Sequence, residues 1–246
     1  MTSYADLHLK VSPNASLETV ENLLKEDARL GYRLIGIAFS PEVSAEYINR
    51  LKLLSKSINV DLVTRVDLAP VTTKELLVYL KLVRRRFEVV AVKCNNKQIA
   101  RQAAKDRRVD ILSFSTDPRK RFFDKAEAEL ASKSFATLEI DMASMLELKG
   151  LERVRLISCL RREVLTAQRF NVPILLSSGT HDKFLLRKPR EYIALTQLFD
   201  MDFKEAKIAI SYIPYGIIAR NRRKLSSNYV CPEVYIVRRG KNCLSI

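Results

Sequence analysis

Short runs of apolar residues recur along the chain, and each run has the length of a buried strand. Their starts mostly lie about 22 to 30 residues apart, which is roughly the length that one strand, one helix and two short loops consume. This period predicts a series of βα units. The predicted strands are Tyr4–Leu9, Leu34–Phe39, Val60–Leu68, Phe87–Val92, Val109–Phe114, Phe135–Ile140 and Pro173–Ser177.

Between these runs the apolar residues follow helical spacing. Gly31 is placed to end the first helix, since glycine readily adopts the left-handed conformation of a helix C-cap. Thr72 and Glu75 have the spacing of a capping box and predict the start of another helix. Helices are predicted around Leu17–Ala28, after Thr72, over Leu151–Val164, Arg190–Phe199 and Phe203–Ala209, and from Pro214 to Lys224.

Strands that alternate with helices indicate a mostly parallel sheet. A closed barrel fits this number of units better than an open doubly wound sheet, which usually begins with a glycine-rich turn. We therefore predict an α/β fold, a TIM-like (β/α) barrel of seven to eight βα units that forms a single domain over residues 1–227. A C-terminal basic extension is predicted over residues 228–246, with Val234–Val237 as an added strand.

The net charge and its distribution along the chain indicate which class of partner the protein binds. The 246-residue chain is 47% hydrophobic and 29% charged, and it carries 43 Lys and Arg against 28 Asp and Glu, a formal net charge of +15. Residues 84–123 hold twelve basic and four acidic side chains, and residues 216–246 hold seven and one. Such local excess attracts polyanions, most often nucleic acid. No apolar run reaches the roughly 20 residues of a membrane span, and the N-terminus lacks a signal-peptide pattern, so we expect a cytoplasmic protein.

Acidic and histidine side chains near the predicted strand ends resemble a depleted metallohydrolase site. Functional side chains of a (β/α) barrel collect at these ends. Catalytic zinc usually takes three protein ligands that include several histidines, and this chain has two histidines in all. Ser177 and Ser178 adjoin His181 on one loop, whereas a catalytic triad is assembled from separate segments. We therefore expect no catalytic residue and no metal from the candidates Asp6, His8, Glu139, Asp141, His181 and Asp182.

Basic side chains at strand ends, in the loops that follow them and on the last predicted helix are candidates for RNA binding. Arginine and lysine meet phosphates, and their density on the last helix suits phosphate contacts better than a single salt bridge. Phe122 and Phe123 follow such a cluster and offer base stacking or, more simply, core packing. The predicted RNA-binding residues are Lys10, Arg65, Arg119, Lys120, Arg121, Lys125, Lys183, Arg187, Lys188, Arg220, Arg222, Arg223 and Lys224.

Seven short stretches match one known family in order and spacing. They are Tyr4–Leu9, Leu30–Tyr32, Leu62–Val66, Glu88–Val92, Val109–Leu112, Ile174–Ser178 with Arg187 and Pro189, and Ala219–Lys224. On these stretches the chain resembles ribonuclease P protein component 3, the 30-kDa subunit family of archaeal and eukaryotic ribonuclease P, from about residue 4 to residue 225. Relatives often have Lys-Arg-Pro where this chain has Asp124-Lys125-Ala126, so only Lys125 is carried over there.

The resemblance implies a barrel related to metal-dependent phosphoesterase barrels, within the ribonucleoprotein that removes the 5′ leader of precursor tRNA. It implies that the RNA subunit holds the chemistry and its Mg²⁺, while the protein binds no cofactor. The implied partners are ribonuclease P RNA, a small ferredoxin-like protein subunit, other ribonuclease P proteins and precursor tRNA, with no membrane. Compactness and charge favour an archaeal origin.

Two other functions compete with this interpretation. The first is an autonomous metal-dependent phosphoesterase, which the small number of histidines disfavours. The second is a scaffold whose basic face binds an acidic protein. Cleavage without RNA distinguishes the first, and salt-sensitive RNA binding argues against the second. The phosphoesterase would use Asp6, His8, Glu139, Asp141 and His181.

Overall fold

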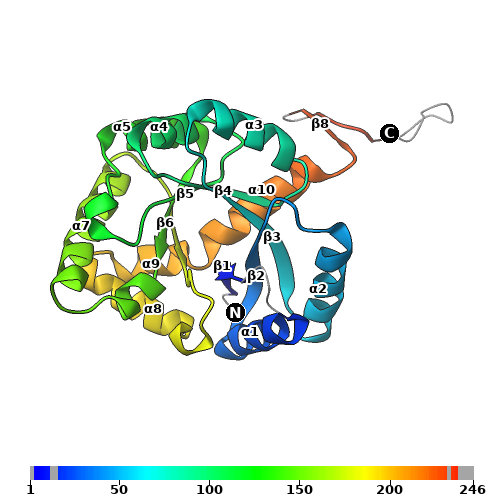
Figure 1. Cartoon of the computed structure of the whole chain (residues 1–246), viewed down its shortest axis with the longest axis horizontal. Coiled ribbons are helices and arrows are strands. Elements are labelled where there is room, and N and C mark those ends of the chain that lie inside the picture. The colour runs from blue at the N-terminus through cyan, green and yellow to red at the C-terminus, as the bar shows by residue number, and fades with distance from the viewer. Residues whose placement is uncertain (1–2, 12–15, 232–233, 238–246) are drawn as a thin grey trace.

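Seven parallel strands form the main sheet of the computed structural model, which describes residues 3–11, 16–231 and 234–237 (Figure 1). The strands lie side by side in chain order, so each βα unit places its strand next to the preceding one. This confirms the predicted (β/α) barrel, with seven units. The strands are β1 (Tyr4–Lys10), β2 (Tyr32–Phe39), β3 (Asp61–Leu68), β4 (Val89–Lys93), β5 (Ile111–Ser113), β6 (Thr137–Asp141) and β7 (Ile174–Ser177).

The barrel closes between β1 and the segment that follows β7. Gly179 N donates to His8 O at 3.0 Å, and Lys10 N donates to Thr180 O at 2.9 Å. At the other end of β1, Ala5 N donates to Ile210 O at 3.0 Å. Within the described residues no eighth strand joins the sheet, so irregular backbone satisfies the hydrogen-bonding groups that an eighth strand would pair.

Helices surround the barrel and bury a large apolar layer against the outer side of the strands (Figure 1). Gly31 has φ 111° and caps the first helix, and Thr72 and Glu75 form the predicted capping box. The helix predicted over Arg190–Phe199 is divided into an α-helix and a 3₁₀ turn, Thr196–Phe199. The helices are α1 (Leu17–Leu30), α2 (Ala45–Ser57), α3 (Thr73–Val83), α4 (Lys97–Lys105), α5 (Lys125–Ser134), α6 (Ala143–Glu147), α7 (Gly150–Arg169), α8 (Pro189–Leu195), α9 (Phe203–Ala209) and α10 (Tyr212–Leu225).

The last helix, α10, plugs the end of the barrel where the strands begin. Its Ile217 and Ile218 are buried in a second apolar cluster inside the barrel. Asn221 is also buried, and its Nδ2 donates to Glu88 O, just before β4, at 2.8 Å. The strand side chains that complete this interior cluster are Ala5, Leu7, Leu34, Val63, Val89, Ala91, Ile111 and Leu175.

An irregularity in β1 determines which of its side chains enter the barrel. Asp6 pairs with Ile35 and Leu9 with Ile37, so two residues of β1 oppose the single residue Gly36. A bulge of this kind interrupts strict alternation. Leu7 belongs to the interior cluster and Leu9 to the outer one, and His8, between them, points into the barrel.

Gly36→Ala is expected to lower the free energy of unfolding by about 1–3 kcal/mol, the usual cost of overpacking. A Cβ at this position would lie 2.7 Å from Leu7 O and 2.9 Å from Leu7 Cα, and backbone atoms cannot turn aside as a side chain can. Urea denaturation measures the effect. Gly216→Ala is the control, since nothing lies within 4 Å of its added Cβ; an equal loss in both variants would contradict the steric explanation.

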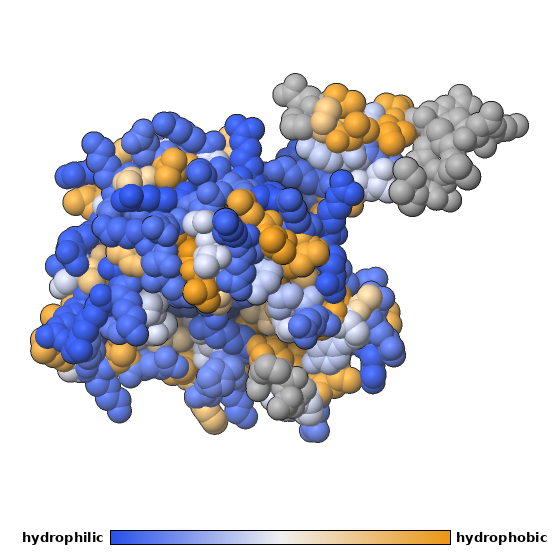
Figure 2. All heavy atoms as spheres, turned by 45° about the horizontal axis from the view of Figure 1, so that its top comes forward, coloured by the Kyte–Doolittle hydropathy of each residue, from blue (hydrophilic) through white to orange (hydrophobic). Residues whose placement is uncertain are grey.

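The predicted added strand is a hairpin separate from the barrel. A strand covers only Val234–Tyr235 (β9), and it pairs antiparallel with β8 (Tyr229–Cys231) instead of joining the main sheet. The hairpin projects from the end of α10 (Figure 1), and Figure 2 shows its apolar side chains gathered at the surface. Residues 232–233 and 238–246 of the predicted basic extension lie outside the described residues, and the domain boundary at residue 227 stays a prediction.

Candidate functional site

Five charged or titratable side chains meet inside the barrel mouth, where β1, β3 and β6 end. His8 Nδ1 lies 2.9 Å from Asp141 Oδ1 and 3.4 Å from Glu139 Oε1, and His8 Nε2 lies 3.1 Å from Asp67 Oδ2. The fifth member, Arg65, is 0% exposed. The mouth therefore brings three strands together through charged contacts.

Arg65 lies at the centre of this group. Its two terminal nitrogens donate to the two oxygens of Glu139 at 2.5 and 2.7 Å, and its Nε donates to Asp67 Oδ1 at 2.6 Å. A further bond, at 3.2 Å, reaches Leu7 O. Bidentate charge-assisted bonds of this kind are strong and fix both partners. The guanidinium thus fills the space between the carboxylates of β3 and β6.

The charges of the mouth balance one another. Burial lowers the pKa of His8, as does Arg65, but Asp141, Glu139 and Asp67 outweigh both and place it well above the usual value of 6.5. Burial raises the pKa of Asp67, yet Arg65 and His8 bring it well below 3.8. Protonated His8, Arg65 and Lys10 therefore face three ionised carboxylates. Lys10 Nζ lies 3.5 Å from Asp141 Oδ2 and donates to Gly179 O at 2.6 Å.

This balance does not fit a divalent metal. His8, Glu139 and Asp141 offer ligand atoms within 4.8 Å of one another, which is the spacing of a metal centre. Metal ligands must be deprotonated, but Asp141, Glu139 and Asp67 raise the pKa of His8, and both oxygens of Glu139 bind Arg65. A cation entering here would meet the positive charges of Arg65 and Lys10, and the carboxylates beside it already bind those two side chains.

Three of the six candidate residues take no part in this cluster. Asp6 points away from the barrel interior, where its Oδ1 accepts bonds from the backbone N–H groups of His8 and Ser178 at 3.0 Å. His181 is exposed, and the Asp182 carboxylate accepts a bond from Phe184 N at the start of a 3₁₀ turn. The structure brings together His8, Glu139 and Asp141 of the six candidates, whereas Asp6, His181 and Asp182 do not belong to the cluster.

Two arginines from the predicted RNA-binding set are engaged inside the protein. Arg65 is fully buried, and Arg121 is 4% exposed and binds Glu163 of α7 at 2.5 Å. Arg121 also donates to Ser115 O at 3.0 Å. Neither side chain presents its charge to a partner, so both are removed from the set. The two phenylalanines after Arg121 pack against Phe114, which supports the core-packing alternative.

The remaining basic candidates divide between the two ends of the barrel. Residues in loops after strands lie toward the mouth, whereas α10 lies at the opposite end, because it plugs the side where the strands begin. Arg222 there binds Asp61 and Glu88 at 2.6 Å. The mouth group is Lys10, Arg119, Lys120, Lys125, Lys183, Arg187 and Lys188, and the α10 group is Arg220, Arg222, Arg223 and Lys224.

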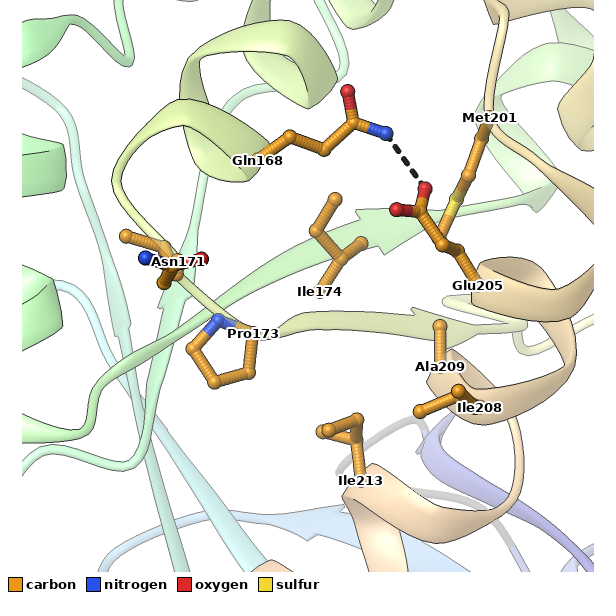
Figure 3. Close-up of a pocket in the computed structure, with 10 residues that line it drawn as sticks. Gln168, Asn171, Pro173, Ile174, Met201, Glu205, Ile208, Ala209 and Ile213 are labelled. Carbon is orange, nitrogen blue, oxygen red and sulfur yellow. Dashed lines mark hydrogen bonds between the residues drawn. The ribbon is translucent and has the colours of Figure 1, made fainter.

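An apolar hollow of about 310 Å³ lies at the start of β7, between α7 and α9 (Figure 3). Pro173, Ile174 and Ile213 line it, and its polar contact is a bond from Gln168 Nε2 to Glu205 Oε2 at 2.6 Å. Without a nucleophile, a second carboxylate or a basic side chain, this lining offers no catalytic constellation. The hollow is therefore a weaker candidate for a functional site than the mouth group and the α10 group of basic residues.

The family model described as RNase P subunit p30 matches residues 3–226. The chain belongs to the RNase P subunit p30 family. Ribonuclease P protein component 3 of Methanococcoides burtonii is 31% identical over 95% of this chain and 94% of its own length. Its counterpart in Methanosarcina barkeri is 32% identical over 56% of this chain and 58% of its own length. The resemblance found in the sequence is confirmed.

Several solved structures share the fold of this p30 protein. A chain in the cryo-EM structure of archaeal ribonuclease P with mature tRNA matches 96% of this chain and 99% of its own length, with a TM-score of 0.82 at 21% identity. Histidinol phosphate phosphatase from Lactococcus lactis, complexed with zinc, matches 89% of this chain and 94% of its own length, with a TM-score of 0.51 at 10% identity. This confirms the predicted relation to phosphoesterase barrels in fold alone. Among the described residues, no helix of this p30 protein is long and apolar enough to cross a membrane.

Proposed function

We propose that this p30 protein binds the RNA subunit of ribonuclease P and stabilises its active fold, without an active site of its own. Family membership makes the chain a protein subunit of the ribonucleoprotein that removes the 5′ leader of precursor tRNA. The proposal that the chain has no active site of its own is supported by Arg65, whose guanidinium occupies the centre of the barrel mouth. The catalytic position of a (β/α) barrel is therefore neutralised, while a net charge of +15 remains for polyanions.

The proposed partners are ribonuclease P RNA, precursor tRNA, a small ferredoxin-like subunit and the other protein subunits. Mg²⁺ is assigned to the RNA and no cofactor to the protein, and the proposed location is the cytoplasm. Phosphate contacts by exposed lysines and arginines lower the repulsion between RNA helices that approach closely, and they make the affinity depend on salt. The proposed contacts are the mouth group of basic residues and, from the α10 group, Arg220, Arg223 and Lys224, since Arg222 binds two carboxylates of the protein.

A reconstitution assay tests this function. We expect no cleavage of precursor tRNA by the purified protein with Mg²⁺, Mn²⁺ or Zn²⁺, because the mouth carboxylates are occupied by Arg65, His8 and Lys10. With the cognate RNA and the other subunits, adding the protein is expected to raise the rate of 5′-leader removal several-fold at limiting Mg²⁺, where the active RNA fold most needs support.

The His8→Ala variant supplies the control for this assay. Cleavage by the protein alone that is lost in His8→Ala would make the mouth an active site and overturn the proposal. An unchanged rate of the reconstituted particle with and without the protein would contradict the stabilising role.

A further inference from the structure

The end of α10 and the segments around it carry positive charge that the protein itself does not neutralise. Arg220, Arg223 and Lys224 lie in its last two turns. Arg84 follows α3, and Arg107 lies in the turn before β5. We call these five residues the α10 basic face. They lie at the closed end of the barrel, away from the mouth.

A single buried carboxylate organises this face. Asp110 Oδ2 lies 2.6 Å from Arg84 Nη1, and Asp110 Oδ1 lies 2.9 Å from Arg220 Nη2. The same Asp110 accepts a bond from Val90 N at 3.0 Å, so it is fixed to the sheet. Arg84 also donates to the carbonyl oxygens of Arg108 and Glu88 at 3.3 Å. Two guanidinium groups are therefore held in place before any ligand arrives, which lowers the entropic cost of binding one.

One carboxylate cannot balance the cations that surround it. Lys224 is exposed, and the electrostatic fields of Arg220, Arg84 and Arg107 act on its ammonium group. Asp110 also acts on this ammonium group, and both of its oxygens already bind arginines. The neighbouring acid Asp106 binds Arg108 at 2.7 Å and adds no compensation. The face keeps an excess of positive charge that a bound anion would relieve.

On the opposite side of α10 the positive charge is neutralised by the protein itself. Arg222 binds two carboxylates, Asp61 at 2.6 Å and Glu88 at 2.6 Å, and is neutralised within the protein. On one side of the helix a single arginine therefore binds two carboxylates, whereas on the other side several cations share one carboxylate, Asp110. Ion pairs such as those of Arg222 are enough to hold α10 against the barrel. The excess positive charge on the other side of the helix therefore indicates a ligand.

We propose that the α10 basic face binds the phosphate backbone of the ribonuclease P RNA. This inference rests on the proposed function and places RNA binding at the closed end of the barrel. Most (β/α) barrels bind their ligands at the mouth instead. Guanidinium groups held in a fixed geometry match phosphate oxygens, and a nucleic acid strand supplies a regular series of negative charges. An acidic protein surface is the alternative occupant, and the test separates the two.

The test removes the two exposed cations that take no part in holding α10. Binding of the cognate ribonuclease P RNA to the full chain is measured by fluorescence anisotropy over a series of salt concentrations. Arg107→Gln/Lys224→Gln is expected to weaken binding about tenfold or more and to reduce the slope of log affinity against log salt by about two, one for each lost phosphate contact. Lys224→Arg, which keeps the charge, is expected to bind like the parent.

Lys204→Gln/Lys207→Gln is the matched control, since it removes the same charge from exposed positions on α9. If both double variants weaken RNA binding equally, or neither does while the parent binds, the α10 assignment is wrong and the proposed function stands. If the parent protein itself neither binds the RNA nor stimulates the particle, the proposed function fails. If Arg107→Gln/Lys224→Gln keeps its RNA affinity but no longer assembles with the other protein subunits, the face is a protein interface and the proposal is overturned. Equal urea midpoints establish that every variant is folded.

Discussion

Arg65→Met is expected to lower the free energy of unfolding by about 3–5 kcal/mol, the range found when one partner of a buried ion pair is removed. The substitution preserves much of the side-chain volume, so the loss comes from charge. Glu139 would lose both of its guanidinium bonds and Asp67 one, in surroundings where Arg65 is fully buried. Urea denaturation followed by circular dichroism measures the change.

Two further variants test whether the loss of stability comes from the ion pairs of the mouth. Arg119→Met removes an arginine that is 69% exposed and binds Glu152 at 2.9 Å, and it should change stability by no more than about 1 kcal/mol. Adding Glu139→Gln to Arg65→Met should restore part of the loss, because it removes the carboxylate left without a partner. A loss below that of Arg119→Met would show that the mouth does not depend on Arg65 for its charge balance.

Glu163→Ala is expected to cost a similar amount, about 3–5 kcal/mol, for the reciprocal reason. It leaves the Arg121 guanidinium buried with Ser115 O as its remaining hydrogen-bond acceptor. The three bonds between Arg121 and Glu163 connect the loop before α5 to α7, so their loss also weakens the attachment of that loop. The thermal and urea midpoints of the variant should both fall.

The compensated double variant shows whether charge or packing is responsible. Arg121→Met/Glu163→Leu replaces the pair with apolar side chains and should recover most of the stability lost in Glu163→Ala, since an apolar replacement of a buried pair is often neutral. Glu163→Gln, which retains one acceptor oxygen, should fall between the parent and Glu163→Ala. A double variant as unstable as Glu163→Ala would assign the effect to packing instead of charge.

The barrel could be predicted because its signal is local and repeated. Each strand is an apolar run, and the helix caps at Gly31 and Thr72 depend on residues only a few positions away. Errors arose where backbone geometry overrides the pattern. Phe135 was assigned to a strand by its apolar character, but it caps α5 in the left-handed conformation with φ 68°, and β6 begins at Thr137.

The candidate site was less predictable, because its partners are distant in sequence. Arg65 reads as one more basic residue until Glu139, from β6, is placed beside it. Arg121 is similar, since its acidic partner belongs to α7. Strict alternation would place Asp6 and His8 on the same side of β1, and only the bulge opposite Gly36 separates them. Asp110, just before β5, carries no signal of its own in the sequence, because its partners Arg84 and Arg220 belong to distant segments.

The position of α10 in the chain affects how the protein is made. The helix that fills the closed end of the barrel is the last one before the hairpin, and the seven strands it seals are all synthesised earlier. During translation the strands therefore emerge with an apolar interior that is open at one end, and it stays open until residues 212–225 have left the ribosome. Chains that terminate before this helix would expose Leu7, Leu34 and Val63 to solvent and be recognised by chaperones and proteases. The interior of the barrel is therefore closed only after residues 212–225 have been synthesised.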